Sequence, residues 1–236
     1  MKILAFDSTA TAASVAICDD GKVMAEFIVN AGLTHSRTLV PMLDAALKNT
    51  DSDLKSVDAL AISNGPGSFT GVRIGVAVAK GIAFAENLPC FEISTLESMA
   101  YNLTLTDCIV CAAMDARCAQ VYNAIFEIKY GEVCRLCEDR AISIADLKAE
   151  LNDNYQGKRI ILVGDGAELC FKEFMDTSLS LELAPDALRF QRASSVAAAA
   201  FDKLKKGEKP KSASELLPSY LRLSQAEREL KKKENK

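Results

Sequence analysis

Residues 63–75, SNGPGSFTGVRIG, decide the fold class, because a glycine-rich turn leads directly into a long apolar helix. Gly65-Pro66-Gly67 predicts a tight turn, and Ser68 is a favourable N-cap for a helix over residues 68–86. A turn between a buried strand, here residues 57–63, and a helix often binds phosphate. No Gly-Lys-Ser/Thr triplet follows, so the favoured interpretation is a structural turn.

Around this segment the chain repeats one pattern of elements. Strands are predicted at residues 2–7, 13–19 and 22–29, then a helix at 34–49, the strand at 57–63, the helix at 68–86, a strand at 89–93 and a helix from 95. A second set comprises strands at 107–115, 120–127 and 132–139, a helix from 143, a strand at 158–163, and helices at 167–175 and 194–206. The repeated order β-β-β-α-β-α-β-α predicts an α/β fold of two similar lobes, each a mixed five-stranded sheet covered by helices.

We expect lobes at residues 1–103 and 104–210, with residues 211–236 able to return to the first lobe before ending in a charged tail. The 236 residues carry a net charge of −4, which argues against a broad basic surface for nucleic acid. Arg73 and Lys80 interrupt the longest apolar run, so no membrane span is predicted. With no signal peptide apparent and eight cysteines without dense spacing, a cytoplasmic protein is expected.

Two Cys-x-x-Cys pairs, Cys108 with Cys111 and Cys134 with Cys137, match the spacing of a four-cysteine zinc site. The residues between each pair continue strands, where positions three apart face opposite sides, so buried core thiols are the favoured interpretation. The sequence contains one histidine, His35, which excludes motifs that need two. No metal site is therefore expected.

Two neighbouring helices carry more apolar surface than one stripe requires. In the helix at 68–86, small residues recur every four positions and form a ridge that would let another helix pack closely: Gly71, Gly75, Ala79 and Ala83. An exposed apolar patch of this kind predicts a protein partner, although burial of every face inside this chain stays open. The predicted interface residues are His35, Leu39, Val40, Met42, Leu43, Leu47, Phe69, Val72, Arg73, Gly75, Val76 and Ala79.

Five motifs, in this order along the chain, carry a family resemblance: Phe6-Asp7-Ser8-Thr9, residues 64–75, Met114-Asp115-Ala116-Arg117, Gly164-Asp165-Gly166-Ala167 and Pro218-Ser219-Tyr220-Leu221-Arg222. Together with the duplicated pattern they resemble the TsaB, or YeaZ-like, family of the sugar kinase, Hsp70 and actin (ASKHA) superfamily. The resemblance implies a non-catalytic subunit that binds and activates a TsaD-type catalytic paralogue in making tRNA N6-threonylcarbamoyladenosine. It also implies a TsaE-type ATPase as partner and tRNA contact through the complex. The apolar patch, when it lacks its partner, would let the chain form a homodimer through the same helices, and the sequence leaves homodimer or monomer open.

In this superfamily the hairpins that carry Asp7 and Asp115 flank nucleotide phosphates. Ser8 stands where ATP-using relatives commonly have a glycine, so we expect a remnant of a phosphate site and no cofactor. The metal-binding histidines of the catalytic paralogue correspond to Thr95 and Met99, which are poor ligands. An ATP-dependent small-molecule kinase using the cleft between the lobes is the alternative function. The candidate remnant comprises Asp7, Ser8, Thr9, Gly65, Gly67, Asp115, Gly164 and Gly166.

Overall fold

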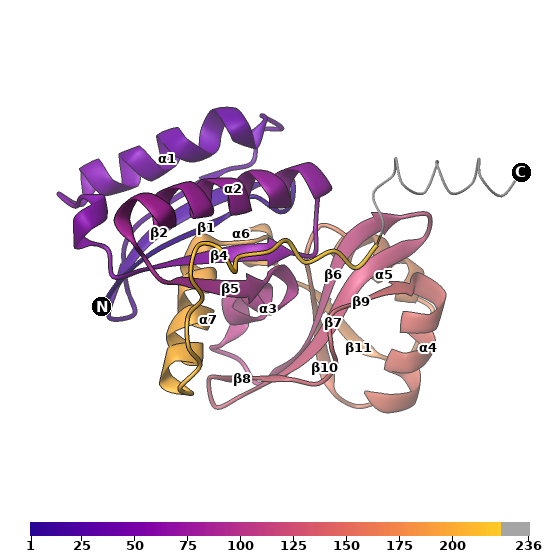
Figure 1. Ribbon diagram of the computed structural model, residues 1–236. Coiled ribbons are helices and arrows are strands. Elements are labelled where there is room, and N and C mark those ends of the chain that lie inside the picture. Colours follow the sequence, from indigo (N-terminus) through magenta and orange to yellow (C-terminus); the bar gives the residue numbers. More distant parts are fainter. Residues whose placement is uncertain (223–236) are drawn as a thin grey trace, which may run out of the picture.

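The computed structural model describes residues 1–222, which form two lobes, each built on one sheet (Figure 1). Within these residues the first sheet has five strands in the order β3-β2-β1-β4-β5. β1 pairs antiparallel with β2 and parallel with β4, as the predicted order of hairpin strands and crossovers requires. The strands are β1 (Lys2–Asp7), β2 (Ala13–Asp19), β3 (Lys22–Val29), β4 (Ala59–Gly65) and β5 (Cys90–Ser94).

Two helices, α1 (His35–Asn49) and α2 (Phe69–Glu86), lie side by side over one face of this sheet (Figure 1). The predicted N-cap of α2 is confirmed, because the Oγ of Ser68 accepts a hydrogen bond from the Gly71 N–H at 3.3 Å. A short 3-10 turn, η1 (Leu54–Ser56), precedes β4. The apolar side chains that α1 and α2 place on the sheet are Leu39, Met42, Leu43, Ala46, Val72, Val76, Ala79 and Ala83.

The second lobe repeats this strand order with one edge divided in two. Among the described residues its sheet has six strands, in the order β11-β10-β6-β7-β8, with β9 also paired to β7. The predicted strand at residues 132–139 is wrong as one element, since β8 and β9 pair with successive halves of the same edge of β7. At the break, the Cys137 Sγ accepts the Ile125 N–H at 3.2 Å. The strands are β6 (Cys108–Arg117), β7 (Gln120–Lys129), β8 (Glu132–Arg135), β9 (Arg140–Ser143), β10 (Arg159–Val163) and β11 (Ser180–Leu183), of which β11 was not predicted.

The remaining helices cover the other sheet faces. α4 (Ile144–Asn154) and α5 (Ala167–Phe174) pack on one face of the second sheet. The predicted cap of α4 is confirmed, because the Ser143 Oγ accepts a hydrogen bond from the Asp146 N–H at 3.0 Å. α3 (Thr95–Ala100), continued by η2 (Tyr101–Leu103), packs on the second sheet although it follows the first. α7 (Ala193–Lys205), which follows the short α6 (Asp186–Arg189), packs on the first sheet although it follows the second. Each lobe therefore lends a helix to the other, and within residues 1–222 no helix has both the length and the apolar character needed to cross a membrane.

The paired cysteines follow the strand geometry in part. Cys108 and Cys111 are buried in separate core clusters on opposite faces of β6, so the prediction of core thiols is confirmed for this pair. Cys137 is half-buried, and the prediction is wrong for Cys134, which is exposed because it alternates along β8 with Val133, the residue that packs on the core. In the part of the chain that the structure describes, no three His, Cys, Asp or Glu residues are grouped as metal ligands.

Candidate docking face and the cleft between the lobes

The side of α2 that points away from the sheet is apolar and open. Gly81 lies at its centre, and a Cβ added there would meet nothing within 4 Å. Residues three and four positions away along the helix share this side. Its largest member is Phe84, whose side chain is 86% exposed. We call this surface the outer face; its exposed residues are Thr70, Arg73, Ala77, Gly81, Phe84 and Ala85, and Ile74 and Val78 at its edge are half-buried against the core.

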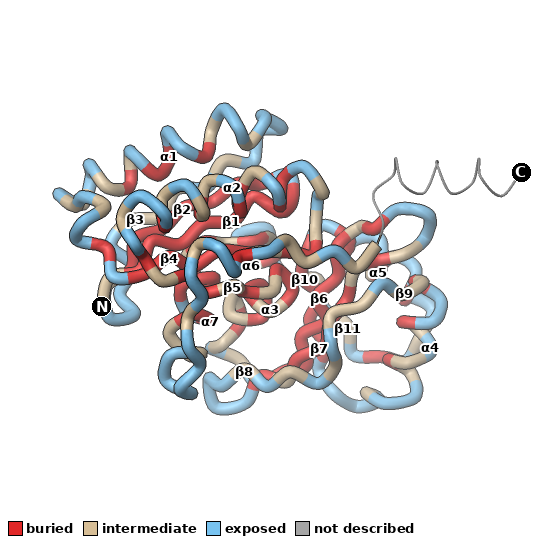
Figure 2. The backbone as a smooth tube through the Cα atoms, in the orientation of Figure 1, coloured by how far each residue is buried: buried red, intermediate tan, exposed pale blue. Residues whose placement is uncertain are grey.

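The neighbouring helix extends the same surface. Val40 on α1 is 54% exposed, and Leu33, just before α1, is 45% exposed. The exposed side of α1 also carries charges, namely Arg37 and the pair Asp44 and Lys48, whose Oδ2 and Nζ atoms are 2.7 Å apart. Figure 2 shows exposed positions along the sides of α1 and α2 that face away from the sheet. The exposed surface of α2 is thus largely apolar and available to another molecule, whereas that of α1 combines Val40 with polar residues such as Ser36.

The predicted ridge faces inward and is covered by the chain itself. A Cβ at Gly71 would lie 2.1 Å from the Ser8 carbonyl oxygen, and one at Gly75 would lie 2.6 Å from the Ser8 Oγ. These glycines therefore let α2 approach the loop after β1, where the Ser8 Oγ donates to the Gly71 carbonyl at 2.9 Å. The ridge is a packing feature of this lobe, and a partner would meet the opposite side of α2.

The other predicted interface residues divide between core and surface. Val40 and Arg73 are exposed, while Leu47 and Phe69 are half-buried. His35 is also half-buried, and its Nε2 lies 2.6 Å from the Ala10 carbonyl oxygen, which ties the start of α1 to the first hairpin. The structure places the remainder in the core between the helices and the sheet: Leu39, Met42, Leu43, Val72, Gly75, Val76 and Ala79.

A cavity of about 500 Å³ lies between the lobes. Its walls are the loop after β1, the start of α2, the end of β6 and a segment near the end of the described chain. Among the predicted phosphate-site residues, Thr9, Gly67 and Asp115 line this cavity, whereas Asp7 does not. The remaining lining residues used below are Phe69, Arg117, Ser219, Tyr220 and Arg222.

Asp7 is enclosed behind the cavity and is 1% exposed. Its Oδ1 accepts the N–H and the hydroxyl of Thr9, each at 2.8 Å, which shapes the hairpin loop. Burial in the apolar interior raises the pKa of the Asp7 carboxyl. Asp115 faces the cavity instead, where its Oδ2 lies 3.0 Å from an Arg117 guanidinium nitrogen. The two aspartates are therefore not presented together to a metal or phosphate.

The glycines near the cleft make contacts within the chain. Gly65 has φ +122°, and a Cβ there would lie 2.4 Å from the Ser219 carbonyl oxygen. Only glycine tolerates both that backbone conformation and that approach. Gly67, Gly164 and Gly166 likewise abut backbone atoms of Thr9, Ala113 and Asp115, respectively.

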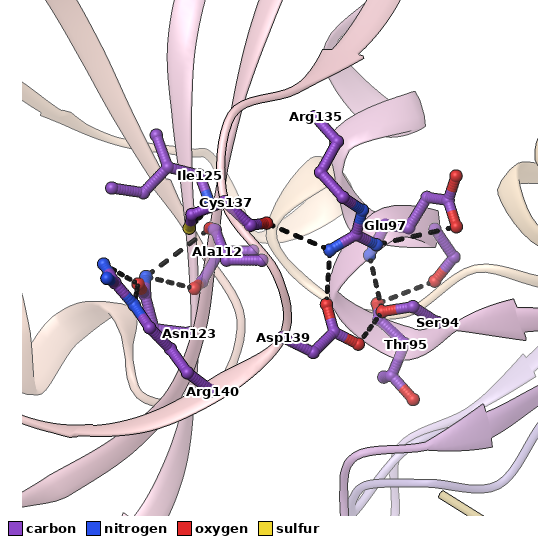
Figure 3. A network of polar contacts seen from close by, with 12 residues as sticks. Ser94, Thr95, Glu97, Ala112, Asn123, Ile125, Arg135, Cys137, Asp139 and Arg140 are labelled. Carbon is purple, nitrogen blue, oxygen red and sulfur yellow. Dashed lines mark hydrogen bonds and ion pairs between the residues drawn. The ribbon is translucent and has the colours of Figure 1, made fainter.

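Two clusters that sequence analysis did not predict join distant parts of the chain. Tyr220 stacks on Phe69 with ring centroids 4.8 Å apart, and its hydroxyl accepts a bond from the Arg73 Nε at 2.8 Å. In the second cluster, the Ser94 Oγ donates to Asp139 at 2.5 Å, and an Arg135 nitrogen donates to the same carboxylate at 2.6 Å (Figure 3). The sequence motif that contains Tyr220 was the one available signal for the first cluster, and the second had none.

Two lobes of matching strand order, with exchanged helices and a cleft between them, define a protein of the ASKHA class. A family model described as "TsaD: tRNA N6-adenosine threonylcarbamoyltransferase" matches residues 29–230. The tRNA threonylcarbamoyladenosine biosynthesis protein TsaB of Bacillus subtilis (strain 168) is 29% identical over 235 residues, 96% of each chain. TsaB of Buchnera aphidicola subsp. Schizaphis graminum is 31% identical over 166 residues, covering 70% of this chain and 78% of the relative.

Among solved structures, YeaZ from Pseudomonas aeruginosa superposes with a TM-score of 0.79 at 27% identity, covering 93% of this chain and 99% of that one. The chain belongs to the TsaB, or YeaZ-like, family. The resemblance predicted from the five motifs is therefore confirmed.

Proposed function

We propose that this chain is a non-catalytic subunit of the machinery that makes tRNA N6-threonylcarbamoyladenosine, and that it binds and activates a TsaD-type catalytic subunit through the outer face of α2 and the adjoining side of α1. The observation that carries the proposal is the exposed apolar centre of α2 around Gly81 and Phe84. The names of its relatives supply the pathway.

The chemistry of the outer face suits a partner helix. Ala77, Gly81 and Ala85 form a row without bulky side chains, so a second helix can lie close to the α2 backbone. Phe84 borders this row and would lose most of its exposed apolar area on contact. Arg73 is the one charged residue of the outer face as defined above, so little desolvation opposes association.

Three placements support a role without catalysis. Thr95 and Met99, which correspond to the metal-binding histidines of the catalytic paralogue, are each 0% exposed within the core. His35 holds the first hairpin through its contact with Ala10. Asp7 is enclosed rather than presented to the cleft, which also weakens the alternative of a small-molecule kinase.

The remaining partners follow from the same proposal. A TsaE-type ATPase would dock on the surface that the chain and the TsaD-type subunit form together, and tRNA would be contacted through the complex. In isolation the outer face can pair with a second copy of itself, giving a homodimer by the same contacts. The complex is proposed to work in the cytoplasm, without a cofactor bound to this chain.

The test is sedimentation velocity of the chain mixed with the TsaD-type subunit from the same organism. We expect a complex with the wild-type chain, its loss with Phe84→Asp, and its retention with the control Tyr130→Asp. Phe84 and Tyr130 are both 86% exposed, so the two substitutions differ in location and not in burial. Failure of the wild-type pair to form, or equal binding by both variants, would reject the proposed interface.

A further inference from the structure

Residues 217–222 cross from the first lobe to the second, and we call this segment the clasp. Its first contact is with the end of β4: the Ser219 N–H donates to the Asn64 carbonyl at 2.7 Å, and the Asn64 Nδ2 donates to the Leu217 carbonyl at 3.2 Å. Gly65, beside Asn64, leaves room for the Ser219 carbonyl. The clasp is thus anchored to the glycine turn that precedes α2.

Its second contact is with the first turn of α2. The ring of Tyr220 stacks on Phe69 at an interplanar angle of 28°, and the Arg73 guanidinium lies 3.9 Å from the Phe69 centroid. The hydrogen bond from Arg73 to the Tyr220 hydroxyl closes this three-residue cluster. Stacking, the cation–π contact and the charged hydrogen bond all stabilise this cluster. Together they hold Tyr220 against α2 more strongly than any one of these contacts would.

Its third contact reaches the second lobe. An Arg222 guanidinium nitrogen donates to the Ala116 carbonyl at 2.5 Å. Ala116 is the penultimate residue of β6, just before the β6–β7 hairpin. The next three residues, Arg117, Cys118 and Ala119, have φ values of +66°, +57° and +54°. Such values are unfavourable for residues other than glycine, so this hairpin depends on surrounding contacts to hold its shape.

We propose that the clasp is a built-in closure that holds the two lobes together across the cleft and fixes the β6–β7 hairpin relative to α2. Enzymes with a ligand between two lobes need those lobes to open and close. Here the clasp, a part of the same chain, forms one wall of the cavity. It makes hydrogen bonds to Asn64 in the first lobe and to Ala116 in the second. The lobes are also joined by the exchanged helices α3 and α7 and by the network of Ser94, Asp139 and Arg135, so the clasp adds a further connection, at the cleft.

One consequence depends on the proposed function above. Arg73 belongs both to the outer face and to the clasp cluster, so a partner on α2 would contact a residue that governs lobe closure. The clasp itself requires no partner. Its test is therefore carried out on the isolated full chain, and its outcome is independent of whether the partner interface is correct.

The experiment is hydrogen-exchange mass spectrometry on the full chain and its single variants. In Arg222→Met and in Tyr220→Ala, we expect amide exchange in peptides covering residues 115–120 to accelerate about tenfold. This is the change in the local opening equilibrium expected when one charge-assisted hydrogen bond is lost. Tyr220→Phe keeps the stacked ring and should give a smaller change. Arg37→Met is the matched control, since the Arg37 side chain is exposed and makes no ion pair or hydrogen bond within residues 1–222.

Exchange in β10, in the core of the second lobe, reports on global stability and should not change in any variant. Acceleration confined to residues 115–120 in the clasp variants supports the proposal. Unchanged exchange there in both Arg222→Met and Tyr220→Ala overturns it. An equal acceleration in β10 also overturns it, because the segment would then contribute to general stability and not to closure.

Discussion

Replacing Gly81 separates folding from partner binding more cleanly than any other change on the outer face. The position is exposed in the interior of α2, and a Cβ there meets nothing within 4 Å. Alanine in place of glycine in a helix interior stabilises by about 0.5–1 kcal/mol. For a domain of this size that raises Tm by roughly 1–4 °C. Arginine has nearly the same helix propensity as alanine, so Gly81→Arg should keep most of this gain.

Binding should respond in the opposite sense. Helices in close contact have axes about 8–10 Å apart, which leaves no room for an arginine at the centre of the contact. Displacing the partner helix or burying an unpaired guanidinium should weaken association at least about 100-fold, or roughly 2.7 kcal/mol. The assays are thermal unfolding by circular dichroism and calorimetric titration with the TsaD-type subunit. If Gly81→Arg folds as expected and binds within threefold of wild type, the outer face is not the interface.

Four further predictions use the inner contacts and the titratable groups. Gly71→Ala, which sets a Cβ 2.1 Å from the Ser8 carbonyl, should destabilise by about 2 kcal/mol and lower Tm by roughly 4–8 °C; a Tm equal to wild type in a thermal scan would show that α2 shifts freely. Because burial raises the pKa of Asp7, the stability this group contributes is present at acid pH and is lost as pH rises through the folded-state pKa. Asp7→Asn should therefore gain stability relative to wild type as pH rises above 3.8, the ordinary pKa of the group, in urea titrations, and a difference that stays constant with pH would contradict the assignment. Iodoacetamide at neutral pH should label the exposed Cys118 and Cys134 well before Cys111, since burial raises the pKa of the Cys111 thiol far above its usual value; equal labelling under native conditions would count against the buried position. Asp139→Asn removes the charge that binds Arg135 and should cost about 1–3 kcal/mol in urea unfolding, whereas no loss would mean that solvent screens this pair.

The helix α2 illustrates how far sequence alone could predict the candidate site. The chain contains two rows of small residues four positions apart on this helix, one through Gly71 and Gly75 and one through Ala77 and Gly81. Periodicity shows that both rows exist, but which row faces the core depends on contact with Ser8, more than sixty residues away. The helix does expose the apolar side chain of Phe84, but the row chosen as its contact surface, through Gly71 and Gly75, is the inner one.

The second lobe shows a similar limit. Residues 132–139 contain neither glycine nor proline to mark the break between β8 and β9. The break is stabilised instead by the Cys137 thiol and by the Asp139 network, both of which are tertiary contacts. The duplicated order of strands was predictable because it rests on local hydrophobic patterns, which the two lobes repeat.

In the sequence the clasp appeared as one of the five family motifs, within a segment expected to be able to return to the first lobe, but its individual contacts were not predicted. Its residues lie far along the chain from their partners, since Asn64 bonds to Leu217 and Arg73 to Tyr220. No spacing rule connects positions so distant. Its association with the glycine turn also gives Gly65 a role that does not involve phosphate.

The central claim, that the TsaD-type subunit binds the outer face, is tested most directly by hydroxyl-radical footprinting of the chain with and without that subunit. Phe84 and Tyr130 are equally exposed at 86%, and Met175 is 71% exposed on the second lobe, so all three should be oxidised readily in the free chain. We predict that oxidation of Phe84 falls several-fold in the mixture while Tyr130 and Met175 stay as reactive as before. Undiminished oxidation of Phe84 in a mixture shown to contain the complex would contradict the claim.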